Sequence, residues 1–245
     1  MIDKNDSYGA AGKQMKLLSM LKDFHQFCVD NEINYSIIGG TLLGAIRDKG
    51  FIPWDADVDV VMNRENYDKL MKVVEAMGDY TVVEKLWVPK VVEKKNVVNG
   101  EIPDGTPVVD IFIVDRVPAG SFSKKAKLLE LKVLQGMMKT KKNEKKKFSA
   151  VTKAALAVTS VMGKVFSMEK KQKMYTSVSM RGNKDTSRPL MICNDVFRSL
   201  GCEYDPHLMD EYTLVNFEDT QLMAIKNWEN YLVEQYGDYM TPVRM

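Results

Sequence analysis

Two aspartates, Asp57 and Asp59, stand two positions apart in the run Asp57-Val58-Asp59-Val60-Val61, where acidic and β-branched residues alternate. In a β-strand, residues two apart point to the same face, about 6–7 Å from each other along the backbone. Two carboxylates on one face repel each other, and burial worsens this because an unpaired charge is costly to desolvate. A divalent cation relieves the repulsion, and Mg²⁺ prefers oxygen ligands that it commonly shares with phosphates.

A third carboxylate, Asp110, interrupts the apolar run at residues 108–114. An acid at the centre of a buried strand is usually kept there by a metal ion or a cationic partner. If this strand lies beside that of Asp57 and Asp59, three carboxylates converge. We therefore predict that Asp57, Asp59 and Asp110 are the catalytic residues and hold Mg²⁺ or Mn²⁺. Such a triad suits phosphoryl or nucleotidyl transfer. The alternative is that residues 57 and 59 merely lie in an exposed strand or turn.

Upstream of these acids, the run Ile38-Gly39-Gly40-Thr41 predicts a tight turn that leads into a helix N-terminus. Free backbone N–H groups at such a turn can bind phosphate with help from the helix dipole, and glycine permits the close approach. We therefore predict that Gly39, Gly40 and Thr41 line a substrate phosphate. A Gly-Gly pair alone is more often a plain turn, but here it precedes an Asp-x-Asp strand and a third strand aspartate.

Several charged side chains are further candidates for binding the substrate. Two cations stand just before the Asp-x-Asp run, where they could grip a diphosphate. Another begins a predicted helix, where a cation opposes the helix dipole and so needs a partner such as phosphate. A fourth lies in a loop, and one more carboxylate could support the metal site. These residues are Arg47, Lys49, Arg64, Arg181 and Asp55. For each of them, a solvated surface position is the alternative.

Hydrophobic periodicity and turn signals supply the elements that must position these residues. The patterns predict helices at 13–32, 41–48, 65–77 and 224–236, with Asn63 capping the third. They predict strands at 34–38, 57–61 and 108–114, and a strand or hairpin within 80–98. The fold class is therefore α+β.

Residues 124–173 are strongly basic, with 15 Lys against three Glu, a net charge of +12. The pattern predicts two helices at about 123–147 and 149–175. A solvated surface, a nucleic-acid site and a surface that docks on an anionic membrane all fit such a segment. We expect no nucleic acid, because only Phe148 and Phe166 interleave the lysines and could stack on bases. Peripheral contact with an anionic membrane is the more specific hypothesis.

The whole chain of 245 residues carries a formal net charge of +2 and three cysteines. The odd number and irregular spacing of the cysteines favour a reducing compartment. The first 16 residues are polar, and no run of about 18 apolar residues occurs. The sequence therefore predicts a cytoplasmic protein that rests on the inner face of the plasma membrane when it docks there.

Two longer motifs resemble the LicD family. They are Gly40-Thr41-Leu42-Leu43-Gly44-Ala45-Ile46-Arg47 and Gly50-Phe51-Ile52-Pro53-Trp54-Asp55-Ala56-Asp57-Val58-Asp59. The run Val109-Asp110-Ile111-Phe112 is similar to the family's third-carboxylate strand, and Asn216-Phe217-Glu218 and residues 231–240 to its closing segment. The sequence departs from the pattern at Ala56, where the family usually has an acid, and at Ile113, where it has a proline.

The resemblance implies a nucleotidyltransferase fold, a mixed β-sheet flanked by helices, here with a Lys-rich helical insertion. It implies Mg²⁺-dependent transfer of a phospho-alcohol such as phosphocholine. The donor would be a nucleotide-diphospho-alcohol such as CDP-choline, and the acceptor a hydroxyl of a glycan, lipid-linked or on a cell-surface polysaccharide precursor. Asp110 would be a ligand or a general base.

The expected organisation is a core at 1–120, a basic helical segment at 121–180 and a part at 181–245 that completes the core. Two other functions stay open at this point. An enzyme of this fold could transfer the nucleotide itself from a nucleoside triphosphate to a hydroxyl, or the chain could be a catalytically silent membrane or nucleic-acid adaptor.

Overall fold

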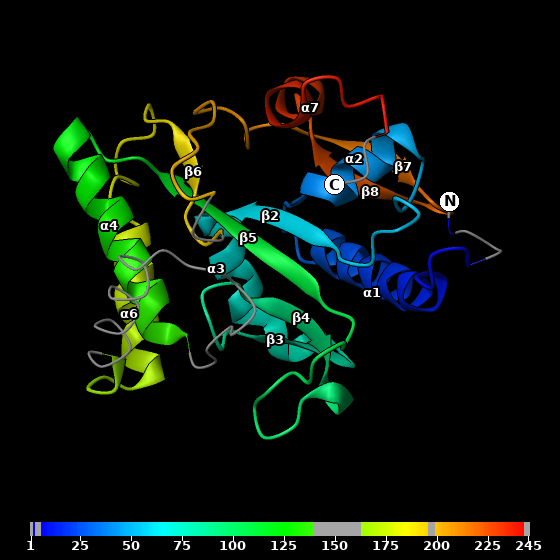
Figure 1. The fold of residues 1–245 in the computed structure, drawn as a ribbon, viewed down its shortest axis with the longest axis horizontal. Coiled ribbons are helices and arrows are strands. Elements are labelled where there is room, and N and C mark those ends of the chain that lie inside the picture. The colour runs from blue at the N-terminus through cyan, green and yellow to red at the C-terminus, as the bar shows by residue number, and fades with distance from the viewer. Residues whose placement is uncertain (1, 3–5, 140–162, 196–198, 243–245) are drawn as a thin grey trace. The chain divides into compact units, whose positions relative to one another are not determined.

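The computed structural model describes residues 2, 6–139, 163–195 and 199–242. The chain divides into two compact units, drawn in Figure 1. Unit 1 comprises residues 1–83, 89–113 and 207–245, and unit 2 comprises residues 84–88 and 114–206. The expected organisation into 1–120, 121–180 and 181–245 stays a prediction.

Unit 1 contains a β-sheet in which the strands follow the order β1-β2-β5-β4-β3. The strands are β1 (Ser36–Ile37), β2 (Asp59–Asn63), β3 (Tyr80–Val83), β4 (Lys90–Glu93) and β5 (Val109–Arg116). β2 and β5 lie side by side at the centre (Figure 1). β3 and β4 form an antiparallel hairpin, as expected within 80–98. The order brings the strand that follows Asp57 next to the strand that contains Asp110.

Helices of unit 1 flank this sheet, which confirms the α+β class. They are α1 (Ala11–Asp30), α2 (Gly39–Arg47), α3 (Arg64–Val73) with the short 3₁₀ helix η1 (Val74–Ala76), and α7 (Trp228–Tyr236). α2 and α3 contact β2. α3 begins where the sequence predicts, because the Asn63 side chain accepts a hydrogen bond from the backbone N–H of Asn66 at 2.9 Å.

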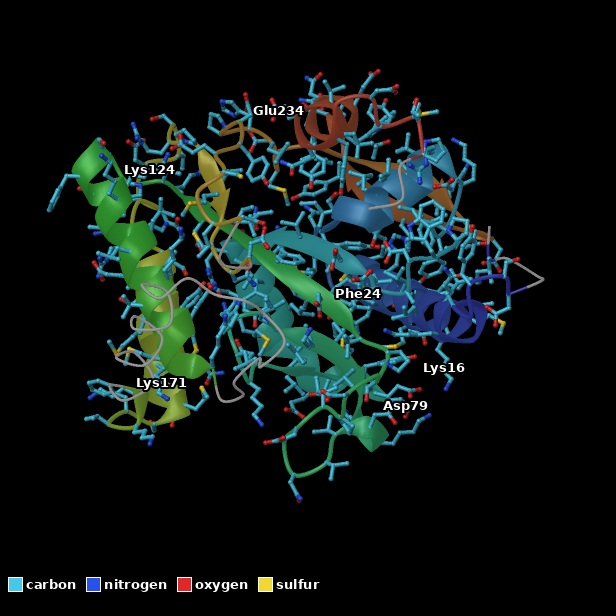
Figure 2. The ribbon with its side chains drawn as sticks, viewed as in Figure 1. Lys16, Phe24, Asp79, Lys124, Lys171 and Glu234 are labelled. Carbon is cyan, nitrogen blue, oxygen red and sulfur yellow. The ribbon has the colours of Figure 1, made fainter. Side chains whose placement is uncertain are left out.

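An apolar core holds α1 against the rest of unit 1. Phe24 of α1, labelled in Figure 2, is 1% exposed. Its ring meets the ring of Tyr35 edge-on, with centroids 5.1 Å apart. Leu17 and Leu21 on the same helix are fully buried. Each such side chain contributes roughly 1.5–3 kcal/mol by leaving water. The helix predicted at 13–32 is therefore present, but it begins and ends two residues earlier, at Ala11 and Asp30.

The last part of unit 1 is an antiparallel hairpin of β7 (Tyr212–Phe217) and β8 (Thr220–Ile225). β8 lies against β1, where the Ser36 hydroxyl accepts a hydrogen bond from the backbone N–H of Ile225 at 2.9 Å. The helix predicted at 224–236 was therefore too long. Its first two residues belong to β8, and α7 begins only at Trp228. The prediction began too early because the apolar residues at the end of the strand continue the helical spacing.

Unit 2 contains α4 (Ser121–Met138), α6 (Met168–Ser179) and β6 (Leu190–Ile192), which pairs with the end of β5. α4 and α6 pack on a buried cluster that includes Leu131, Leu134 and Tyr175. The helices predicted at 123–147 and 149–175 are thus confirmed only as α4 and α6. Residues 140–162 of those predictions lie outside the described residues.

Some lysines of the basic segment are structural. Lys127 of α4 is fully buried, and its ammonium donates to the carbonyls of Arg116, Ser179 and Arg181 at 2.8, 2.5 and 3.1 Å. Lys171 of α6, labelled in Figure 2, is 7% exposed and donates to a carbonyl at the end of α4. The last carbonyls of a helix lack intrahelical partners, so Lys127 and Lys171 cap the C-terminal ends of α6 and α4 by donating to them. The charge of +12 therefore overstates the charge that faces solvent.

Candidate active site

Asp57 and Asp59 lie at the entrance to β2. The strand begins at Asp59, two residues later than predicted, and Asp57 precedes it and is exposed. The alternation holds nevertheless, because Val58 and Val60 are buried at 1% and 0% exposure while Asp59 is half-buried on the other side. Asp110 is the second residue of β5, and its backbone N–H donates to the Val58 carbonyl at 2.9 Å. This bond fixes the two acid-bearing segments side by side.

The carboxylates act strongly on one another. Burial raises the pKa of Asp59 to about 8, and the charges of Asp57, Asp110 and Asp55 add to the rise. Burial, a hydrogen bond shared with Asp57 and the charge of Asp57 raise the pKa of Asp55 to about 7. Four carboxylates thus share one region of unit 1. This is the state that a divalent cation relieves.

A lysine that the sequence analysis did not single out lies within this region. Lys90 of β4 is the antiparallel partner of Asp110 on β5, and its ammonium forms an ion pair with the Asp110 carboxylate. Lys90 also lowers the pKa of Asp59, against the three carboxylates that raise it. Its side chain is 34% exposed, so the ammonium stays in reach of a solute. Sequence spacing gave no signal for this pair, because strand pairing brings the two residues together.

The glycine turn stands directly beside the carboxylates. Gly39 has a φ of +60°, a conformation that favours glycine. A Cβ atom at Gly39 would lie 3.4 Å from Oδ2 of Asp59, and one at Gly40 would lie 2.7 Å from Oδ2 of Asp55. Without side chains at these positions, the carboxylates approach the N-terminus of α2 closely. Binding of a phosphate at this N-terminus stays a prediction.

Thr41 has a different local role. It is 6% exposed, and its Oγ1 accepts a hydrogen bond from the backbone N–H of Asp59 at 3.0 Å. The hydroxyl therefore anchors the start of β2 to α2. The contact of Thr41 with a phosphate stays a prediction.

Gln14 of α1 clamps the loop that leads into the acidic run. It is fully buried, and its Nε2 donates to the carbonyls of Ile52, Pro53 and Asp55 at 3.1, 3.4 and 2.6 Å. Hydrogen bonds from this one side-chain amide to three carbonyls fix the path of residues 52–55 and hence the position of the Asp55 backbone. The sequence gave no signal for this role, since Gln14 lies far from the motif along the chain.

The C-terminal part of unit 1 closes the other side of this loop. The Glu218 carboxylate accepts a hydrogen bond from the backbone N–H of Phe51 at 3.0 Å, and the Glu218 N–H donates to the Lys49 carbonyl at 2.8 Å. The rings of Phe51 and Phe217 meet edge-on at 4.9 Å. These contacts show that the motif at residues 50–59 and the motif Asn216-Phe217-Glu218, which lie far apart along the chain, pack against each other.

Tyr236, the last residue of α7, also reaches the site. Its hydroxyl would lie 4.0 Å from a Cβ atom at Gly39. Burial raises the pKa of Tyr236, and the charges of Asp59 and Asp55 raise it further. The hydroxyl therefore stays protonated beside the carboxylates and can donate a hydrogen bond. The resemblance covered this segment, but we assigned Tyr236 no role from the sequence.

The predicted phosphate-binding cations have other partners in the structure. The guanidinium of Arg47 is 7% exposed and pairs with its neighbour Asp48 at 2.8 Å. Lys49 is exposed and donates to the Ile46 carbonyl at 3.0 Å. Arg64 stands 5.8 Å from the ring centroid of Tyr67 on its own helix. Their role toward a phosphate stays a prediction.

Arg181 belongs to unit 2 and pairs with Glu130 at 2.6 Å. Its contact with a phosphate also stays a prediction.

The residues of the site fit a divalent cation in their chemistry, since carboxylate oxygens are hard donors and two of the groups have raised pKa values. Their side chains as placed are not a finished ligand shell. Within the part of the chain that the structure describes, no three His, Cys, Asp or Glu side chains are arranged to hold a metal ion. The Asp110 carboxylate forms an ion pair with Lys90 instead.

Comparisons with known proteins agree with the motifs. Residues 32–127 match the family model described as "LicD/FKTN/FKRP, nucleotidyltransferase domain". The chain is 28% identical over 254 aligned residues to the lipopolysaccharide cholinephosphotransferase LicD of Haemophilus influenzae, covering 93% of this chain and 90% of that protein. An uncharacterized protein of Rickettsia typhi is 43% identical over 79 residues, or 31% of this chain and 26% of that protein.

The matched range holds every carboxylate of the site together with the glycine turn and Lys90. The similarity to the Haemophilus protein extends beyond this range over most of both chains. The part of the chain that contains the site is thus the part that matches the LicD-family domain model, residues 32–127.

Proposed function

We propose that this chain is a transferase that moves a phospho-alcohol, such as phosphocholine, from a CDP-alcohol to a hydroxyl of a glycan. The cluster of Asp55, Asp57, Asp59 and Asp110 beside the N-terminus of α2 carries this proposal. Similarity to a lipopolysaccharide cholinephosphotransferase over 93% of the chain supports the choice of donor and acceptor class.

Asp57, Asp59 and Asp110 would hold a divalent cation, Mg²⁺ or Mn²⁺. When bound, the cation would neutralise phosphate charge and polarise the phosphorus. The residues of the chain do the remaining work. Gly39 and Gly40 have no side chains that would shield the N-terminus of α2, which would attract the donor's phosphates.

The attacking hydroxyl of the glycan needs a carboxylate that can take its proton. Asp110 is the candidate, because it lies beside Asp59 yet is 25% exposed and so can meet an acceptor that arrives from solvent. The bond that forms joins the acceptor oxygen to the phosphorus that bears the alcohol. The bond that breaks joins this phosphorus to the bridging oxygen, and CMP leaves.

The acceptor is expected to be lipid-linked, and peripheral contact with an anionic membrane stays a prediction. Phe122 and Leu129, spaced to share one face of α4, are 86% and 65% exposed, and Lys125 lies exposed between them. These side chains would make the contact. Among the described residues, no helix has the length and hydropathy to cross a bilayer.

The test is release of CMP from CDP-choline by the purified protein with Mg²⁺ and a lipopolysaccharide acceptor. Asp57→Asn and Asp110→Asn should each lower turnover on the order of 10²-fold or more, because each removes a charge that faces the reacting phosphate. Asp79→Asn, at an exposed aspartate of unit 1, is the matched control and should keep full turnover.

Full turnover by both site variants would refute the assignment of these residues. Release of pyrophosphate from a nucleoside triphosphate, with none of CMP from any CDP-alcohol, would instead identify a nucleotidyltransferase.

A further inference from the structure

The Lys90–Asp110 pair raises the question of what a lysine does among carboxylates that are expected to bind a metal ion. The two residues are directly opposed on antiparallel strands, so their side chains stand on the same face of the sheet. Their backbone register is fixed on both sides, since β5 is also held to the segment of Val58. The pair is therefore a built feature of the site rather than a chance contact of surface side chains.

The ammonium meets a carboxylate that a divalent cation would also use. Within the described part of the chain, Lys90 is the cation whose charge acts on Asp59 against three carboxylates. A dication at this site and the Lys90 ammonium are therefore competitors for Asp110. If the dication takes the carboxylate, the ammonium loses its partner and needs another anion.

The donor's phosphate is the anion that arrives with the metal ion. A lysine ammonium is a compact charge with three donors on a flexible stem, and it is a common phosphate ligand. Lys90 is open enough to reach a bound solute, at 34% side-chain exposure. By contrast, the ammonium of Lys49 already donates to the Ile46 carbonyl, and the Arg47 side chain is 7% exposed and paired with Asp48.

We propose that Lys90 is a substrate-binding residue that exchanges partners. It neutralises Asp110 while the site holds no metal ion, and it binds a phosphate of the donor once a divalent cation has taken Asp110. This inference rests on the proposed function for the identity of the donor, but its core concerns a diphosphate and a divalent cation only. It predicts effects of opposite sign on the binding of these two species.

The experiment measures binding, so that its result does not depend on turnover. Mn²⁺ binding to the wild type and to Lys90→Met is followed through the EPR signal of free Mn²⁺. The variant should bind Mn²⁺ about tenfold more tightly, because a competing positive charge has left a short-range position. Pyrophosphate binding at saturating Mn²⁺, measured by calorimetry, should weaken about tenfold in the same variant.

Two further variants make the result specific. Lys90→Arg keeps the charge and should bind Mn²⁺ within about twofold of the wild type. Lys95→Met removes an exposed lysine that pairs with Glu93 just after the same strand, and it should change neither affinity. A substitution that merely loosened the sheet would weaken the binding of both Mn²⁺ and pyrophosphate. A rise in Mn²⁺ affinity therefore distinguishes the loss of a competing charge from misfolding.

Unchanged affinities in Lys90→Met, or a loss of both, would overturn the exchange of partners. Failure of the wild type to release CMP from any CDP-alcohol would defeat the proposed function alone, since the opposed shifts for Mn²⁺ and pyrophosphate would still stand.

Discussion

Asp59 should reduce the stability of the metal-free protein at alkaline pH, and its replacement by asparagine should restore that stability. In the unfolded chain this carboxyl is ionised above its ordinary pKa of 3.8, whereas the fold raises the pKa to about 8. The folded state therefore holds a proton that the unfolded state releases, and stability falls as the pH rises from about 4 to about 8. Above pH 8 the loss is complete.

The size of the effect follows from this rise in pKa. At about 1.36 kcal/mol per pH unit, a rise from 3.8 to about 8 corresponds to roughly 5–6 kcal/mol as an upper limit. Rotation of the side chain and entry of water relieve part of it. We therefore expect Asp59→Asn to raise the free energy of unfolding by about 2–4 kcal/mol at pH 8.5, and by roughly a quarter of that at pH 5.

The assay is urea unfolding with EDTA present, followed by far-UV circular dichroism at both pH values. Asp68→Asn is the matched control, because Asp68 is an exposed aspartate on α3 of the same unit and should change stability by less than about 0.5 kcal/mol. A stability gain that is equal at pH 5 and pH 8.5 would refute the reasoning. So would a loss of stability at pH 8.5.

Two further predictions concern the scaffold of the site. A Cβ atom at Gly44 would lie 2.4 Å from the carbonyl oxygen of Gly50, so Gly44→Ala must push backbone apart and should cost about 1–3 kcal/mol in urea unfolding. Gly40→Ala meets only the movable carboxylate of Asp55 and should keep stability within about 1 kcal/mol while lowering turnover; equal stability losses in the two variants would contradict this contrast. Gln14→Leu leaves three loop carbonyls without their donor and should cost about 1–3 kcal/mol and lower CMP release, whereas wild-type turnover in this variant would show that the clamp does not position Asp55.

The local features of the fold were readable from the sequence because they depend on near neighbours. The Asn63 cap, the hairpin within 80–98 and the apolar strand around Asp110 are each set by residues within a few positions. The end of β8 was misassigned for the same reason. Its apolar residues fit a helical period as well as a strand, and only pairing with a distant strand decides between them.

The features that escaped prediction depend on residues far apart along the chain. Lys90 meets Asp110 only because of the register of β4 and β5. Gln14 meets the loop at residues 52–55 only because α1 packs against it. The basic sequence around Lys127 indicates a charged surface, yet Lys127 is buried among carbonyls that only the tertiary fold brings together. The proximity of the acidic residues could thus be predicted, whereas the contacts of Lys90, Gln14 and Lys127 could not.

Unit 1 is assembled from segments that are far apart in order of synthesis. Asp110 leaves the ribosome some 110 residues before the β7–β8 turn at Glu218, which holds the loop ahead of the acids. At about 5–20 residues per second, synthesis from Asp110 to Glu218 takes roughly 5–20 s, and β1 lacks its neighbour β8 throughout this interval. During this interval unit 2, whose residues are translated in between, can fold first. The contacts that hold the loop ahead of the acidic residues therefore form only at the end of translation, so a chain that stalls early contains Asp57, Asp59 and Asp110 without these contacts.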